Sequence, residues 1–161
     1  MEIQANFENG FFKVYDSEER VIGKIKIDPK ANFEKSEIII GDINYQVIRE
    51  NWETKIFENN KPIYHLKTSS FSGNTKIIEL NKTIKGVWGL KWGTQLSDKD
   101  GNSLLKIRNE KKIVNNGSYV IKLENQDLKP MEILISFYGH LYGSSLKQKS
   151  VLVGIMAGSS I

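Results

Sequence analysis

One long apolar run near the C-terminus constrains the fold most. From Pro130 to Leu146 (PMEILISFYGHLYGSSL) the sequence is apolar on every side of a helix, and its only charged side chain is Glu132. Glu132 lies in the first turn, where a carboxylate interacts favourably with the helix dipole. A helix that is hydrophobic all round is buried, so the residues that come before it must enclose it.

The length of this run favours burial inside protein. Its seventeen positions span about 25 Å at the rise of an α-helix, which matches the height of a small barrel and is short for a membrane crossing. We therefore predict no transmembrane segment. Ser136, Gly139 and Gly143 place small residues along one stripe of the helix. Since each mid-helix glycine costs about 1 kcal/mol relative to alanine, we expect a strand backbone to pack closely there.

More than a hundred residues before the helix are patterned as short strands. In Val21 to Ile27 apolar residues recur at every second position, which sends them to one face of a strand. Similar alternation predicts strands around Ile43–Val47, Leu105–Arg108 and Tyr119–Glu124. The runs Glu37 to Ile40, Lys76 to Leu80 and Val87 to Trp92 add β-branched and aromatic content. The pattern indicates about a dozen strands in all.

A similar hairpin pattern occurs three times, in Tyr15–Ile25, Phe57–Leu66 and Leu96–Ile107. Each has an apolar residue, a turn of acidic, Asn or Gly residues, and a returning apolar strand. The copies begin 42 and 39 positions apart. Three copies are too few to close a propeller, whereas a closed meandering barrel leaves no exposed sheet edge. We predict a mainly β fold: a closed antiparallel barrel of about twelve strands around a central hydrophobic C-terminal helix, residues 130–146, in one domain covering 1–161.

Composition excludes several classes of protein. With 161 residues, 39% hydrophobic and 26% charged, the chain is typical of one soluble globular domain. It has no cysteine, which excludes disulfides, thiolate zinc sites and thiol nucleophiles. The N-terminus has neither the basic start nor the apolar core of a secretory signal. We expect a cytoplasmic protein, either free or peripherally bound to a membrane.

The repeated hairpins of the Tyr15–Ile25 kind, followed by a proline-led apolar helix, resemble the tubby C-terminal-like superfamily. This superfamily includes tubby domains, phospholipid scramblases and the LURP-one-related proteins. The resemblance implies a twelve-stranded barrel closed around a central helix, and it covers nearly all of the chain. No basic cluster here aligns residue by residue with the phosphoinositide site of tubby domains. The lipid function therefore does not carry over with the fold.

The apolar tail, residues 151–161 (VLVGIMAGSSI), departs from the family pattern. Its short apolar run fits a final strand, a helix or a partner-binding tail, and the sequence does not choose among them.

Charge is distributed unevenly along the chain. Residues 1–50 carry 7 basic and 10 acidic groups, whereas residues 51–161 carry 16 and 9. Such asymmetry marks a face for phosphates or anionic lipids, or it comes from lysines that solvate the outer faces of strands. The candidate anionic-ligand surface consists of Lys82, Lys85, Lys91, Lys111 and Lys112. Trp88 and Trp92, close to the first three, either stack on a partner or pack on the core helix.

No catalytic or metal-binding pattern is present in the sequence. Asp98, Asp100 and Asn102 have the alternate spacing of a calcium loop, but glycine falls one position early and the twelfth position lacks its Glu, so we predict a hairpin turn. His65 and His140 have no soft ligands near them in sequence, and we expect His140 to be a core residue with one hydrogen-bond partner. Serines near Thr68 to Thr75 lack a nucleophile elbow. We expect no enzyme and no cofactor.

Three functions fit these observations. The first is a noncatalytic module that binds an anionic lipid, a membrane surface or a protein partner, and charge and resemblance favour it. The second is a lipocalin-like barrel that carries a small ligand, for which Gly86-Val87-Trp88 is the only sequence signal and an empty interior is required. The third, less favoured, is a nucleic-acid-binding domain, which would bind more weakly as the salt concentration rises.

Overall fold

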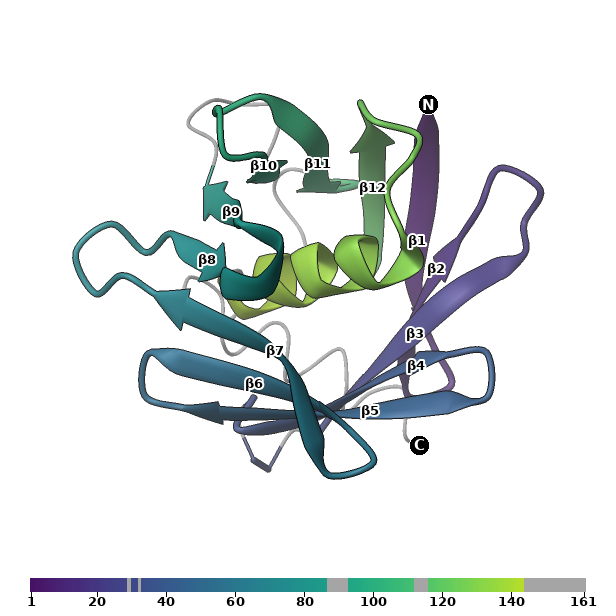
Figure 1. Ribbon diagram of the computed structural model, residues 1–161. Helices are drawn as coiled ribbons and strands as arrows, with labels where there is room; N and C mark the ends of the chain where they lie inside the picture. Colours follow the sequence, from purple (N-terminus) through teal and green to yellow (C-terminus); the bar gives the residue numbers. More distant parts are fainter. Residues whose placement is uncertain (29, 32, 87–92, 112–115, 144–161) are drawn as a thin grey trace.

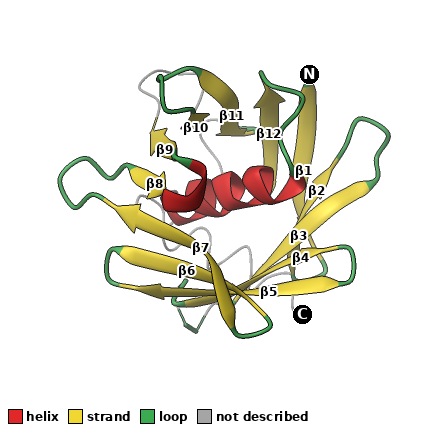
Figure 2. Ribbon diagram, viewed as in Figure 1, coloured by secondary structure: helices red, strands yellow, loops and turns green. Residues whose placement is uncertain are grey.

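The computed structural model describes the chain except for residues 29, 32, 87–92, 112–115 and 144–161. Twelve strands and one short 3-10 helix, η1, precede a helix whose described part covers residues 130–143 (Figures 1 and 2). The elements are β1 (Glu2–Glu8), β2 (Phe11–Tyr15), β3 (Val21–Ile27), β4 (Lys35–Ile40), β5 (Ile43–Glu50), β6 (Glu53–Glu58), β7 (Lys61–Thr68), β8 (Thr75–Ile77), η1 (Ile78–Leu80), β9 (Lys82–Gly86), β10 (Thr94–Ser97), β11 (Ser103–Asn109) and β12 (Ser118–Leu123).

The strands form a closed barrel in which each strand pairs antiparallel with its sequence neighbours and β1 pairs with β12. The predicted fold class is therefore confirmed. The predicted strand Lys76 to Leu80 is too long, because β8 ends at Ile77 and η1 follows. The 3-10 turn ends at Asn81, which has a left-handed φ of 50°. The predicted strand Val87 to Trp92 lies outside the described residues.

The helix lies inside the barrel, as Figure 1 shows, and residues 131–138 are all buried. Phe137 packs against two aromatic rings of the barrel wall, Phe12 at 6.1 Å and Tyr119 at 5.0 Å between ring centroids. Inward-facing apolar residues of the strands complete one core around these rings. The barrel thus buries apolar surface on all sides of the helix, as the sequence predicted.

The close approach between helix and barrel is made by a glycine on a strand, which differs from our expectation. A side chain at Gly23, on β3, would collide with Leu134 of the helix. At Gly139, an added Cβ would lie 3.2 Å from the Ile84 side chain and would meet no backbone. At Gly143, an added Cβ would meet nothing within 4 Å. An added Cβ at Gly93, just before β10, would likewise lie 2.9 Å from the His140 ring, so small residues of the barrel wall make room for the helix.

The three similar hairpins are β2–β3, β6–β7 and β10–β11, which recur every four strands. In each, the register shifts by a bulge just before the turn: between Val14 and Tyr15, between Ile56 and Phe57, and between Leu96 and Ser97. The copies are therefore 42 (56 − 14) and 40 (96 − 56) positions apart. This corrects the sequence alignment by one residue, because Leu96 points into the core like Val14 and Ile56.

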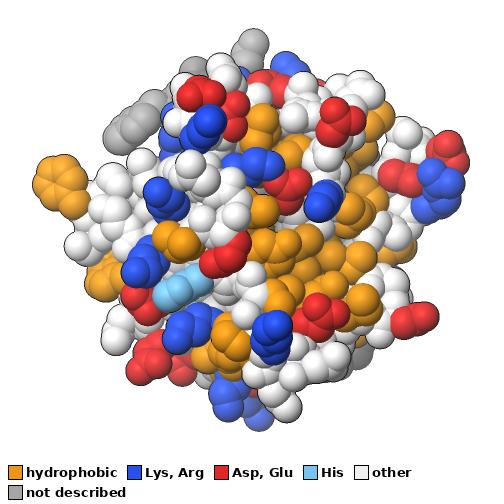
Figure 3. All heavy atoms as spheres, viewed as in Figure 1, with side chains coloured by type: hydrophobic (Ala, Val, Ile, Leu, Met, Phe, Trp, Pro, Cys, Tyr) orange, Lys and Arg blue, Asp and Glu red, His pale blue; other side chains and the backbone are white. Residues whose placement is uncertain are grey.

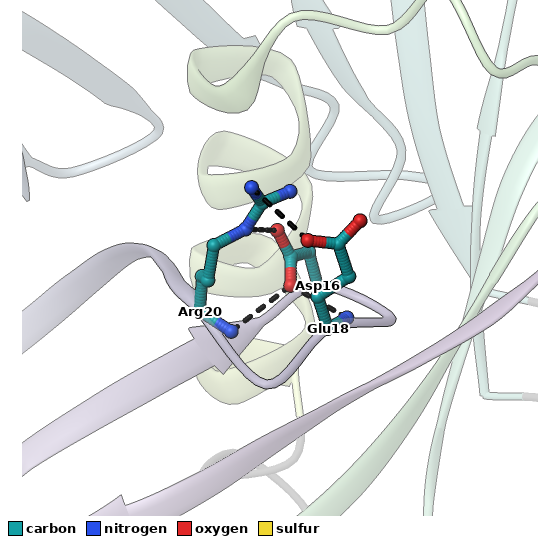
Figure 4. A network of polar contacts seen from close by, with 3 residues as sticks. All are labelled: Asp16, Glu18 and Arg20. Carbon is teal, nitrogen blue, oxygen red and sulfur yellow. Dashed lines mark hydrogen bonds and ion pairs between the residues drawn. The ribbon is translucent and has the colours of Figure 1, made fainter.

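Two of these hairpins have the same turn. The Asp16 carboxylate accepts the N–H groups of Glu18 and Arg20, and the Asp98 carboxylate accepts those of Asp100 and Asn102. These bonds account for the calcium-like spacing of the third hairpin and confirm the predicted turn. In the first hairpin, Arg20 also pairs with Asp16 and Glu18 through its side chain (Figure 4).

Alternate connections of the barrel lie at opposite ends. The helix-start end carries the β2–β3, β4–β5, β6–β7, β8–β9 and β10–β11 connections and the first turn of the helix. The loop end carries the β1–β2, β3–β4, β5–β6, β7–β8, β9–β10 and β11–β12 connections. The last described helix residues reach the loop end, where Tyr142 contacts Arg49 near the end of β5.

Candidate functional site

The structure separates the lysines that we expected to share one surface. Lys82 faces the barrel interior and forms an ion pair with Glu132 of the helix, with 23% of its side chain exposed against 7% for Glu132. Lys85, three positions along β9, lies on the outer face and is half-buried. Lys111 is exposed just after β11. Lys91 and Lys112, together with Trp88 and Trp92, lie outside the described residues.

The Lys82–Glu132 ion pair joins the first turn of the helix to β9. Glu132 also accepts the backbone N–H of Lys129 at 2.9 Å, so one carboxylate satisfies both the helix terminus and a strand lysine. A lysine held in this way has no free charge to offer a ligand. Lys82 therefore stabilises the fold.

The most unusual feature of the loop end is Phe71, which is 100% exposed at the tip of the β7–β8 loop. Figure 1 draws this loop projecting at the left, and Figure 3 shows a hydrophobic side chain extending from the body of the molecule at that edge. Complete burial of a phenylalanine side chain is worth about 1.5–3 kcal/mol relative to exposure. Phe71 contributes none of this to the folded chain.

The loop is ordered by its own hydrogen bonds. The Ser69 N–H donates to the Asn74 carbonyl at 2.8 Å, and the Ser69 hydroxyl accepts the N–H groups of Phe71 and Ser72 at 3.3 Å. At the loop base, the hydroxyls of Thr68 and Thr75 are 2.8 Å apart. Phe71 is therefore held at the tip by a polar loop that does not use its ring.

A second exposed aromatic residue lies in the neighbouring turn. Trp52, in the β5–β6 turn, is 51% exposed, and its carbonyl accepts the Thr68 N–H at 2.8 Å. This bond ties the turn to the base of the loop that carries Phe71. We call Trp52 and Phe71 the aromatic tips.

Three lysines of consecutive strands lie on the outer face beside the aromatic tips. Lys67 and Lys76 are directly opposite each other on β7 and β8, and both are exposed. Ile84 pairs with Thr75 at the loop base, so Lys85 lies one residue farther toward the loop end on β9. We call Lys67, Lys76 and Lys85 the basic patch; Figure 3 shows Lys and Arg side chains over β7 and β8.

The basic patch has one acidic cross-strand neighbour, because Glu53 of β6 lies directly opposite Lys67. Every Asp and Glu of the chain lies among the described residues, and none forms an ion pair with Lys67, Lys76 or Lys85. Like charges directly opposite on neighbouring strands are destabilising. The arrangement therefore places three lysines and one carboxylate on the outer surface, next to exposed aromatic rings.

The sequence analysis missed this combination. It treated Thr68 to Thr75 as a polar serine loop and did not consider Phe71 within it. The available signal was a single aromatic residue inside Ser-Ser-Phe-Ser-Gly, with lysines at positions 67 and 76 on either side. An aromatic residue with no apolar neighbour at two or four positions has no place on a buried strand face.

The two histidines have different surroundings. His140 is 5% exposed, with Nδ1 2.7 Å from the Thr94 hydroxyl and Nε2 2.9 Å from the Asn109 Oδ1. It is a core residue, as expected, and it has two polar partners among the described residues, where we expected one. The His65 Nε2 lies 3.4 Å from a Glu53 carboxylate oxygen on the outer face. Within the described part of the chain, no three His, Asp or Glu side chains are grouped to hold a metal ion.

Comparison with known proteins supports the fold and leaves the function open. The X-ray structure of a protein from Arabidopsis thaliana is similar to this chain, with a TM-score of 0.55 and 12% sequence identity over 86% of each chain. At this identity, the similarity shows a shared barrel fold alone. No protein-family model and no curated protein sequence matches the chain. None of the helices in the described residues has the length and apolar character needed to cross a bilayer.

Proposed function

We propose that this chain is a noncatalytic barrel of the tubby-like kind that binds an anionic membrane surface through its loop end. The observation that carries the proposal is Phe71, fully exposed on a hydrogen-bonded loop beside lysines that form no ion pair with a described acidic residue. A membrane accepts the ring in its interfacial layer while anionic headgroups neutralise the lysines. The protein then acts in the cytoplasm as a peripheral membrane protein.

The helix inside the barrel supports an outward-facing function. Residues 131–138 occupy the interior and are buried, which is where a lipocalin-like barrel would carry its ligand. The basic patch supports an anionic partner, since it has three lysines, and none of them forms an ion pair with an Asp or Glu. Trp52 supports a membrane in particular, because tryptophan favours the layer between headgroups and acyl chains.

Vesicle sedimentation tests the proposal. Wild-type protein is mixed with vesicles of phosphatidylcholine alone or of phosphatidylcholine with phosphatidylserine, and we expect sedimentation with the second only. Each lysine near an anionic surface contributes about 1 kcal/mol, so the Lys67→Gln/Lys76→Gln variant should bind about thirtyfold more weakly. Phe71→Ser should weaken binding about tenfold. This loss should depend less on salt concentration than the loss in the lysine variant, because the lost contact is apolar.

The matched control is Lys99→Gln, which removes an exposed lysine from the β10–β11 turn at the opposite end of the barrel. It should bind like wild type. Wild-type protein that stays in the supernatant with anionic vesicles would overturn the proposal, as would equal losses from Lys99→Gln and the double variant. All variants should keep the wild-type melting temperature, since none of the substituted side chains is buried.

A further inference from the structure

Apolar side chains of three consecutive strands gather on the inner rim of the helix-start end. Ile40 and Ile43 lie directly opposite each other on β4 and β5, and Tyr45 follows on the same face of β5. Val21 of β3 lies two positions before Gly23, where an added Cβ would be 3.4 Å from the Ile40 side chain. We call Val21, Ile40, Ile43 and Tyr45 the rim patch; Figure 3 shows hydrophobic side chains gathered at the right of the view.

The rim patch is accessible although it adjoins the core. Val21 is 51% exposed and Ile43 is 44% exposed, whereas Ile40 and Tyr45 are partly buried and pack against core residues. Apolar side chains that are exposed singly need no partner, but a contiguous apolar patch marks an interaction site. Tyrosine is enriched in protein interfaces, because it combines apolar contact area with a hydroxyl group. The rim patch therefore fits a partner that presents an apolar side chain.

Acidic turns border the rim patch. The β2–β3 turn carries Asp16, Glu18, Glu19 and Arg20, and the β4–β5 turn carries Asp42, so four carboxylates and one arginine give a net charge of −3. In the next turn, between β6 and β7, one acidic and one basic residue lie directly opposite each other. Glu19 and Asp42 are exposed, and neither forms an ion pair with a basic residue in the described part of the chain. Charge complementarity therefore favours a cationic partner.

The opposite end of the same barrel has both properties. Phe71 is 100% exposed at the tip of the β7–β8 loop, and the basic patch beside it has three lysines against one carboxylate, that of Glu53. The β7–β8 loop is at the loop end, whereas the rim patch is at the helix-start end. The two surfaces of one copy therefore cannot meet each other, but those of two copies can.

We propose that Phe71 of one copy covers the rim patch of a second copy, with the basic patch facing the acidic turns. This inference goes beyond the proposed function and does not require a membrane. Because the two surfaces differ, the contact is heterologous: one copy of each pair keeps a free tip, the other keeps a free rim patch, and further copies can add. A membrane that takes up Phe71 competes with a second copy for the same side chain.

Sedimentation velocity of the full chain tests the proposal. Wild type is followed from dilute solution to about 1 mM, because a contact made by one loop is small and such contacts are weak and transient. We expect the sedimentation coefficient to rise with protein concentration. The rise should be smaller in about 1 M salt, where the Debye length is only about 3 Å.

Two variants remove one surface each. The tip variant is Phe71→Ser/Lys76→Gln, and the patch variant is Ile43→Ser/Asp42→Asn. Each alone should associate at least about tenfold more weakly than wild type, because an apolar contact and a charge are both lost. The matched control is Ile48→Ser, which changes a side chain of the same strand that is 39% exposed on the outer face, and it should associate like wild type.

Mixing the two variants shows which surfaces meet. The tip variant keeps its rim patch and the patch variant keeps its tip, so an equimolar mixture should form one-to-one pairs about as strongly as wild type associates. It should not grow beyond pairs, since each pair has one removed surface at either end. A mixture that does not pair would overturn the inference, as would equal losses from Ile48→Ser and the patch variant.

The inference and the proposed function fail separately. Wild type that stays monomeric up to about 1 mM would overturn the contact between copies, and this measurement needs no variant. The patch variant keeps the aromatic tips and the basic patch, so in dilute solution it should sediment with anionic vesicles like wild type. Vesicle binding without self-association would overturn this inference alone, and self-association without vesicle binding would overturn the proposed function alone.

Discussion

Two charge clusters at opposite ends of the barrel differ in how their cations are held. At the helix-start end, Lys82 is paired with the buried Glu132, and Arg20 is paired with Asp16 and Glu18 (Figure 4). At the loop end, Lys67 and Lys76 lie directly opposite each other and form no ion pair, although Glu53 lies opposite Lys67. Like charges directly opposite on neighbouring strands lower stability. The comparison teaches that Lys82 and Arg20 are held by contacts within the fold, whereas Lys67 and Lys76 are the lysines for which we propose an anionic partner.

The exposed hydrophobic side chains also differ between the two ends of the barrel. Exposed apolar side chains at the helix-start end, such as Val21 and Ile43, belong to strands at the rim. Figure 3 shows a patch of hydrophobic side chains lying flat on that side of the molecule, at the right of the view. At the loop end, Phe71 instead extends from a loop tip and packs against no core residue. A projecting ring can enter the interfacial layer of a membrane without moving the body of the protein.

The largest effect should come from breaking the ion pair of the helix-start end. Glu132→Gln leaves the Lys82 ammonium partly buried without its counter-charge, and we expect a loss of about 2–4 kcal/mol in the free energy of unfolding. Urea denaturation measures the loss. Lys67→Gln, at the loop end, should change stability by less than about 0.5 kcal/mol.

A double variant sharpens this prediction. Lys82→Met combined with Glu132→Gln should recover most of the loss, because no unpaired charge remains. Equal stability of Glu132→Gln and wild type would mean that the Lys82–Glu132 ion pair contributes no more to stability than the surface residue Lys67.

A smaller difference should appear along the helix. Gly139 faces Ile84 of β9 at contact distance, whereas an added Cβ at Gly143 meets nothing within 4 Å. Gly139→Leu should therefore destabilise by about 1–3 kcal/mol through overpacking. Gly143→Leu should be neutral or stabilising by up to about 1 kcal/mol, through helix propensity. Thermal melting measures both, and an unchanged melting temperature for Gly139→Leu would contradict the tight packing of the helix in the barrel.

The fold could be predicted from the sequence because its determinants repeat. An apolar run such as Pro130 to Leu146 has few ways to be buried, and alternation along Val21 to Ile27 is independent of distant partners. The bulges could not be predicted, since a one-residue shift in register changes which residue faces the core without changing composition. That is why Leu96 was aligned with Phe57, when the structure places it with Ile56.

The candidate site was harder to predict because it depends on contacts distant in sequence. Lys82 and Lys85 are three positions apart, and period two alone places them on opposite faces of a strand. Only the pairing with Glu132, fifty residues away, removes Lys82 from the surface. Lys76 joins Lys67 across the β7–β8 ladder, which requires the register of that pair. The exposure of Phe71 depends on hydrogen bonds within the loop, and amino-acid composition does not predict these bonds.

The smallest predicted effect concerns acid sensitivity, which should be confined to the helix-start end. Hydrogen bonds from the Arg20 backbone and side chain, with one from Glu18, lower the pKa of Asp16; bonds from Asn102, with those from Asp100 and Gly101, lower that of Asp98. A lowered pKa means that the folded chain favours the charged carboxylate. The resulting stability is fully present above the carboxyl's unfolded pKa of about 4 and is lost as the pH falls through the lower folded value.

Asp16→Asn keeps the shape of the turn, because the amide oxygen can still accept both backbone N–H groups, while it removes the charge and the bond that Oδ2 accepts from the Arg20 side chain. We expect the variant to be slightly less stable than wild type near pH 7, and the difference to disappear as the pH falls below about 4. Asp98→Asn should behave in the same way, since the two turns have the same hydrogen bonds. Urea midpoints at both pH values measure the difference, and a gap between Asp16→Asn and wild type that persists in acid would place the stabilisation in the turn's shape and not in its charge.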